Sequence, residues 1–194
     1  MKHIFEGRIF TIPNLLSFSR ILMIPWFVWM YLGKGNSFAA AMILLLSVIT
    51  DNIDGPIARR WHMESNLGKA LDPLADKLTQ ISVLLCLRSR FPFMLLIICM
   101  MCVKEMAALV TSLVAINRTK VVFSSEWHGK RATDLLDAAL ILHLLFPGMP
   151  GALSYALILL CTGMILLSGV LYVTRNMRAI REAELSTEPE ENRP

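Results

Sequence analysis

The sequence has little charge and no cysteine or histidine cluster at metal-ligand spacing, apart from Cys99 and Cys102, which form a Cys-x-x-Cys pair inside an apolar stretch. Asp, Glu, Lys and Arg make up 18% of the 194 residues, compared with about a quarter in an average soluble domain. The four cysteines all lie within apolar stretches, and they are Cys86, Cys99, Cys102 and Cys161. His128 and His143 also lack partners at ligand spacing. We therefore expect free, buried thiols and packed histidines rather than a thiolate or imidazole metal site.

Other absences limit the domain organisation and the partners. No repeat of fixed period and no Gly/Ser linker divides the chain, which favours a single bundle. The net charge is +4, but the positive residues are scattered rather than combined with an aromatic-lined groove. We therefore expect no nucleic-acid partner.

Apolar residues are abundant instead. They make up 55% of the chain, and the mean hydropathy is +0.57, which indicates a membrane protein. Stretches close to the 20 or so residues that a bilayer-spanning helix needs recur at 13–33, 37–58, 70–87, 92–116, 134–147 and 151–173. The sequence thus predicts an all-α membrane protein, a bundle of six transmembrane helices.

The ends of the chain differ from this core. Met1–Phe10 contains Glu6 and Arg8 and lacks a small-residue cleavage site, so we interpret residues 1–12 as an interfacial N-terminal segment. Residues 13–177 form the predicted six-helix domain. The glutamate-rich residues 178–194 leave the apolar pattern and are expected to form a polar cytoplasmic tail.

Positive residues gather on one side of the predicted bundle. They precede the first span, lie in the 59–69 and 118–131 loops, and follow the last span, whereas the opposite side has only Lys34, Arg88 and Arg90. The positive-inside rule places the richer side in the cytoplasm. We expect a multi-pass protein with both termini there, and the absence of a transit-like N-terminus favours a bacterial inner membrane.

Four aspartates mark the candidate site. Asp51 and Asp54 are three residues apart at the end of the second span, and Asp72 and Asp76 are four apart at the start of the third. These spacings place each pair on one helical face, and the 59–69 loop lets the two faces meet. Carboxylates crowded at a membrane boundary need neutralisation, and oxygen ligands favour Mg²⁺ or Mn²⁺. Such a centre indicates phosphate chemistry.

Spacing alone leaves alternatives open. The aspartates could instead cap helices while paired with Arg59, Arg60 or Lys77. A cation transporter also uses acids within a helical bundle, but here they cluster at one boundary, and the sequence lacks broken helices in paired halves.

The spacing Asp51-x2-Asp54-Gly55-x2-Ala58-Arg59-x8-Gly68-x3-Asp72-x3-Asp76 resembles the signature of the CDP-alcohol phosphotransferase family at every position. This resemblance implies a homodimeric six-helix enzyme that uses two divalent cations, Mg²⁺ or Mn²⁺. By the same resemblance the metal ligands are Asp51, Asp54, Asp72 and Asp76, with Asp76 also the catalytic base. CDP would be bound by Asp51, Gly55, Ala58, Arg59 and Gly68.

Weaker features outside the signature bear on the acceptor. Ile12–Arg20 with Pro25, and Asp72–Lys77, are similar to phosphatidylglycerolphosphate synthases and the related cardiolipin synthases. The first implied reaction transfers a phosphatidyl group from membrane-borne CDP-diacylglycerol to sn-glycerol 3-phosphate, releasing CMP in phospholipid biosynthesis. The acceptor phosphate would need cations, for which the candidates are Lys77, Lys104, Arg118 and Lys130, with Arg20 a further possibility.

One segment departs from the synthase pattern. Asp134 and Asp137 stand in Gly129–Asp137, where those synthases continue with Lys-Thr and then Gln. Extra acids disfavour a dianionic acceptor unless they are paired. Phosphatidylglycerol as acceptor, which would make the chain a cardiolipin synthase, is therefore the nearest alternative, and inositol phosphate or serine stays open.

Overall fold

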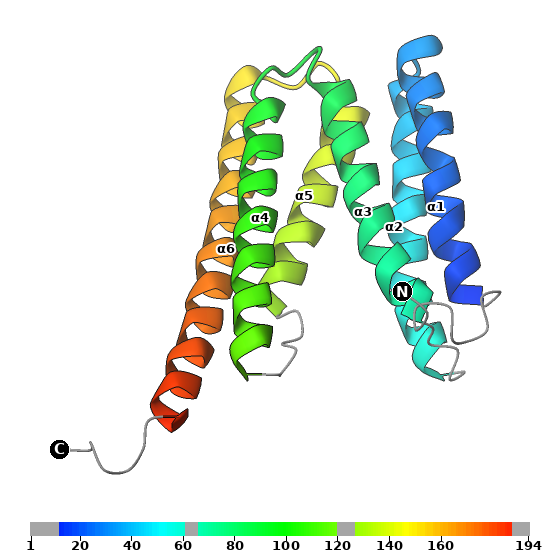
Figure 1. Cartoon of the computed structure of the whole chain (residues 1–194). Coiled ribbons are helices and arrows are strands. Elements are labelled where there is room, and N and C mark those ends of the chain that lie inside the picture. Colours follow the sequence, from blue (N-terminus) through cyan, green and yellow to red (C-terminus); the bar gives the residue numbers. More distant parts are fainter. Residues whose placement is uncertain (1–11, 61–65, 120–126, 188–194) are drawn as a thin grey trace. The chain divides into compact units, whose positions relative to one another are not determined.

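Every regular element in the described part of the chain is helical (Figure 1). The structure is a computed structural model that describes residues 12–60, 66–119 and 127–187. The elements are α1 (Ile12–Val28), the π-helix η2 (Trp29–Gly33) that continues it, α2 (Ser37–Arg60), α3 (Asn66–Leu87), α4 (Met94–Thr119), α5 (Trp127–Leu145) and α6 (Gly151–Thr187). The predicted all-α class is confirmed. The expected interfacial residues 1–12 fall almost entirely outside the described ranges.

The chain divides into two compact units. The first consists of Met1–Leu95 and Asp137–Ser154, and the second of Leu96–Leu136 and Tyr155–Pro194. In the first unit α1 packs against both α2 and α3. Small residues such as Ala40 and Ala75, both fully buried, let the helices approach closely, as they do in membrane bundles.

A tight turn joins η2 to α2. Gly35 has a φ of 62°, a left-handed conformation that glycine adopts without the steric cost of a Cβ. Asn36 follows, and its side-chain oxygen accepts a hydrogen bond of 3.0 Å from the backbone N–H of Ala39. That bond caps the start of α2, so the turn sets where the helix that carries Asp51 begins.

His143 is a packing residue at the end of α5. It is 1% exposed, and its Nδ1 lies 2.7 Å from the carbonyl oxygen of Ala139. Nδ1 therefore donates, which leaves Nε2 to accept from the Ser154 hydroxyl at 3.0 Å. The edge of its ring meets Phe91, with the centroids 4.8 Å apart. This environment agrees with the expectation of a packed histidine.

A polar network joins α4 and α6 in the second unit. Asn176 has no exposed surface, and its amide donates to the hydroxyls of Thr111 at 3.1 Å and Ser112 at 3.2 Å. Ser112 also lies 3.2 Å from the Tyr172 hydroxyl. Interhelical bonds of this kind are typical of membrane bundles.

Within the described ranges, three helical segments are long and apolar enough to cross a bilayer. They are Asn14–Gly33, Met94–Ile116 and Gly151–Arg181, while the apolar part of α2, Ser37–Ile53, is shorter. Six spans were predicted. Among the described residues α3 and α5 do not reach the same apolarity, because α3 carries Asp72, Asp76 and Lys77 and α5 begins with polar residues.

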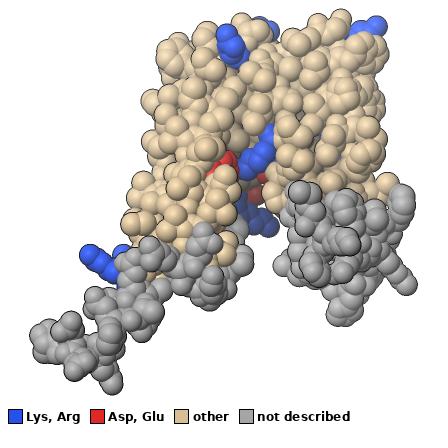
Figure 2. Space-filling model, viewed as in Figure 1, with Lys and Arg blue, Asp and Glu red and all other residues tan. Residues whose placement is uncertain are grey.

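The surface is suited to lipid. Large apolar side chains are exposed along the spans; Leu22 is 59% exposed, Val103 59% and Leu159 65%. Figure 2 shows that most of the described surface on one face carries neither acidic nor basic side chains. Soluble monomers rarely expose apolar area so extensively.

The prediction of buried thiols is confirmed for Cys86 and Cys161 and wrong for Cys99 and Cys102, because α4 directs both outward.

Candidate functional site

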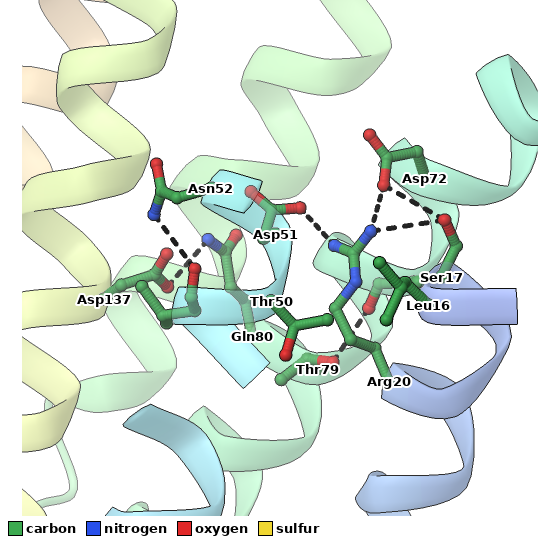
Figure 3. Close-up of polar contacts among 12 residues, drawn as sticks. Leu16, Ser17, Arg20, Thr50, Asp51, Asn52, Asp72, Thr79, Gln80 and Asp137 are labelled. Carbon is green, nitrogen blue, oxygen red and sulfur yellow. Dashed lines mark hydrogen bonds and ion pairs between the residues drawn. The ribbon is translucent and has the colours of Figure 1, made fainter. Parts of the chain in front are cut away.

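Arg20 on α1 joins carboxylates of two other helices (Figure 3). One terminal nitrogen of its guanidinium donates to Oδ1 of Asp51 on α2, and the other donates to Oδ1 of Asp72 on α3. Ser17, one turn earlier on α1, donates its hydroxyl to the same Asp72 oxygen at 3.3 Å. These contacts bring Asp51 and Asp72 together, although 21 residues separate them in sequence.

The burial of Arg20 explains why the aspartates gather around it. Its side chain is 1% exposed, whereas those of Asp51 and Asp72 are 41% and 43% exposed. A buried guanidinium is costly unless it is paired and hydrogen-bonded, and its planar fork can bind two carboxylates at once. The pair of aspartates therefore keeps an open side while Arg20 supplies the positive charge behind them.

A recess adjoins this ion-pair network. Its lining includes polar side chains of four helices: Arg20 on α1, Ser47 and Asp51 on α2, Asp76, Thr79 and Gln80 on α3, and Asp137 on α5. The amide nitrogen of Gln80 donates to Oδ1 of Asp137 at 3.0 Å. On α3, Asp72, Asp76 and Gln80 follow one another at four-residue intervals, so they share a helical face.

The predicted metal ligands are partly described. Asp51 meets Asp72 at Arg20 and lines the recess with Asp76. Asp54 lies on α2, but its side chain is outside the described residues. Over the residues that were described, no group of three or more His, Cys, Asp or Glu side chains forms a metal site. The donor set is made of carboxylate oxygens, which suits hard divalent cations.

The predicted nucleotide-binding residues fall at the end of α2 and the start of α3. Gly55, Ala58 and Arg59 are on α2 and Gly68 is on α3, and the side chains of this stretch lie outside the described part. Their role as a CDP site stays a prediction.

The predicted phosphate-binding cations are divided between the two units. Lys77 lies on α3 beside Asp76, in the first unit. The second unit contains Lys104 and Lys130, and also Arg118, whose side chain is not described. Lys104 donates to Glu105 at 3.0 Å, and Lys130 is exposed. Their role in acceptor binding stays a prediction.

Sequence reasoning missed two polar residues and misjudged a third. Ser17 and Gln80 were not singled out, although the four-residue step from Asp76 to Gln80 was a visible signal. Asp137 was noted only as a departure from the synthase pattern together with Asp134. The structure separates these two acids: Asp134 is exposed, whereas Asp137 is 8% exposed and lines the recess.

Comparison of the sequence with known proteins places the chain in a family. Aligned segments are 43% identical to the cardiolipin synthase (CMP-forming) of Streptomyces coelicolor over 82 residues, and to the CDP-diacylglycerol–glycerol-3-phosphate 3-phosphatidyltransferase of Escherichia coli over 70. They cover 40% and 35% of this chain and 38% of each relative, so well under two thirds of either relative is matched. The family model for CDP-alcohol phosphatidyltransferases matches residues 10–173, a range that contains the whole aspartate network. The chain belongs to the CDP-alcohol phosphatidyltransferase family.

Proposed function

We propose that the chain transfers a phosphatidyl group from CDP-diacylglycerol to an acceptor hydroxyl, with sn-glycerol 3-phosphate as the first-choice acceptor. The products would be phosphatidylglycerolphosphate and CMP. The observation that carries this proposal is the aspartate network of α2 and α3, gathered on Arg20 beside a recess within the family-matched segment. A relative named for this reaction, from Escherichia coli, supports the acceptor.

Divalent cations are part of the proposal. Asp51, Asp54, Asp72 and Asp76 would hold two ions, Mg²⁺ or Mn²⁺, and bound cations would stabilise the charge that develops on the departing CMP. Asp76 would accept the proton of the acceptor hydroxyl, since it lines the recess next to Asp51. In-line attack by that hydroxyl on the phosphoanhydride needs no covalent intermediate with the protein.

The proposed setting is a membrane. Three apolar helices of sufficient length and the exposed apolar surface support integration in a bilayer. We propose six spans, with α2, α3 and α5 completing the bundle, the site open to the cytoplasm, and a homodimer in a bacterial inner membrane. The gathering of positive residues at one end of the predicted spans supports this orientation, because such residues are enriched on the cytoplasmic side.

Cardiolipin synthesis is the second candidate. The relative from Streptomyces coelicolor is named for it, and the buried Asp137 beside the recess disfavours an acceptor with a doubly charged phosphate close by. In that case phosphatidylglycerol would take the place of glycerol 3-phosphate, with the same donor and the same aspartates.

The test is CMP release by the purified full chain in detergent with CDP-diacylglycerol and Mg²⁺ or Mn²⁺. Glycerol 3-phosphate, phosphatidylglycerol, inositol phosphate and serine are compared as acceptors. Asp76→Asn should lower the rate by about 100-fold or more, as expected for loss of a general base, while the exposed Asp134→Asn serves as the matched control. If none of the four acceptors drives CMP release, the proposed activity is contradicted.

A further inference from the structure

The wall of the recess formed by Gln80 and Asp137 is rich in hydrogen-bond acceptors. Gln80 is 1% exposed, and its amide nitrogen donates a hydrogen bond to Asp137. Its side-chain oxygen, Oε1, is also buried and has no hydrogen-bond partner. A buried acceptor left unsatisfied costs free energy, so this oxygen marks a place where a ligand donor would be stabilised.

Asp137 adds to the same wall. It is 8% exposed and uses Oδ1 to accept the Gln80 bond. Its second carboxyl oxygen, Oδ2, is a further acceptor position. Thr79, which also lines the recess, donates its hydroxyl to the carbonyl oxygen of Ala75 at 2.9 Å. The wall therefore suits a ligand group that donates hydrogen bonds, such as a hydroxyl.

The position relative to Asp76 restricts which hydroxyl fits. Gln80 follows Asp76 by one helical turn, about 6 Å along the axis, and both line the recess. The enclosed part of the recess is about as large as one water molecule. The acceptor's attacking hydroxyl would lie at Asp76, and a second hydroxyl on the neighbouring carbon would lie within reach of this space. A phosphate is too large for it.

We infer that Gln80 and Asp137 form a subsite for the second hydroxyl of a vicinal diol, so that the acceptor is a glycerol-type group whose neighbouring hydroxyls meet Asp76 and this pair. The inference rests on the proposed function and narrows it to a substrate class. Glycerol 3-phosphate and the headgroup of phosphatidylglycerol share this diol. The subsite would bind the second hydroxyl, which both acceptors have, and would not distinguish between their phosphate groups.

The experiment compares each acceptor with an analogue that lacks only the second hydroxyl. Glycerol 3-phosphate is paired with 3-hydroxypropyl phosphate, and phosphatidylglycerol with phosphatidyl-1,3-propanediol. CMP release by the full chain gives kcat/KM for each. We expect the diol to be preferred by about 10- to 100-fold in the pair that is used, because its absence leaves buried acceptors unsatisfied.

Variants separate recognition from folding. Gln80→Met and Asp137→Leu keep the side-chain size and remove the acceptors, so the preference for the diol should fall to about 3-fold or less while the analogue is used as before. If Gln80→Met or Asp137→Leu fails to fold, Asp137→Asn is the conservative replacement. It should weaken the preference for the diol in part. Asp134→Asn, at an exposed position three residues before Asp137, should leave the preference unchanged.

Each result has a defined meaning. Equal use of diol and analogue by the wild-type chain would overturn the inference and indicate that the recess holds water only. Variants that slow both members of a pair equally would overturn it too, since that is the sign of a structural role. A preference for serine would assign Asp137 to an ammonium group instead. No release with any acceptor would contradict the proposed function and the subsite together.

Discussion

Asp51 on α2 and Asp72 on α3 accept hydrogen bonds from the same guanidinium group, that of Arg20. Two like charges from different helices would repel each other, and a shared cation offsets this repulsion. Because Arg20 comes from α1 and is 1% exposed, three helices are tied together at the point where the aspartates gather. Arg20 is thus a positioning residue for both acids.

Replacement of Arg20 should therefore affect stability and activity together. Arg20→Ala removes the shared cation and should lower the free energy of unfolding by about 3 kcal/mol, measured as thermal unfolding in detergent. Arg20→Lys keeps the charge but offers one ammonium instead of a two-pronged fork, so it should recover only part of the stability. Arg88→Ala is the control, because Arg88 is exposed. An Arg20→Lys variant with full stability and activity would contradict the positioning role.

Divalent cations should stabilise the folded chain if the aspartates bind them. At a Mn²⁺ concentration about 100 times its dissociation constant the gain is about 2.7 kcal/mol, visible as a higher unfolding temperature without substrate. Asp51→Asn and Asp72→Asn should reduce this gain, and Asp134→Asn should keep it. A gain that survives both substitutions would place the ions elsewhere.

The apolar parts of the fold could be predicted well from the sequence. The expected spans 13–33, 92–116 and 151–173 overlap the three apolar segments Asn14–Gly33, Met94–Ile116 and Gly151–Arg181, because apolar length is a local signal. The polar ends of helices were missed: α3 begins at Asn66, α5 begins at Trp127, and α6 runs to Thr187. Hydropathy does not register helix formed by polar residues, so a search for spans ends where apolarity ends.

The site could be predicted only where it follows local spacing. The four aspartates were recognised from intervals of three and four residues. The pairing of Arg20 with Asp51 and Asp72 spans 31 and 52 residues, and that of Gln80 with Asp137 spans 57. Such contacts depend on how helices pack, which the periodicity of one helix does not specify. For the same reason Asp134 and Asp137 looked equivalent in sequence and differ in burial.

His143 should matter for folding and not for the reaction. His143→Ala removes two hydrogen bonds and the edge contact with Phe91, and it should cost about 3 kcal/mol of unfolding free energy. Ser154→Ala removes only one partner and should cost about 1 kcal/mol. Protein that remains folded should keep its KM for both substrates. A changed KM with unchanged stability would instead give His143 a part in substrate binding.

The bond between Asn176 and Thr111 tests whether α4 and α6 meet in a membrane-like environment. Asn176→Ala and Thr111→Val, alone and combined, form a double-mutant cycle around the 3.1 Å hydrogen bond. Bonds between membrane helices couple by about 0.6 kcal/mol on average, and we expect a value of this size from unfolding in bicelles. Thr174→Val is the control, because its exposed hydroxyl donates within α6 to the carbonyl oxygen of Leu171. Coupling near zero would mean that α4 and α6 do not pair through Asn176, since removal of either partner would then leave the other unaffected.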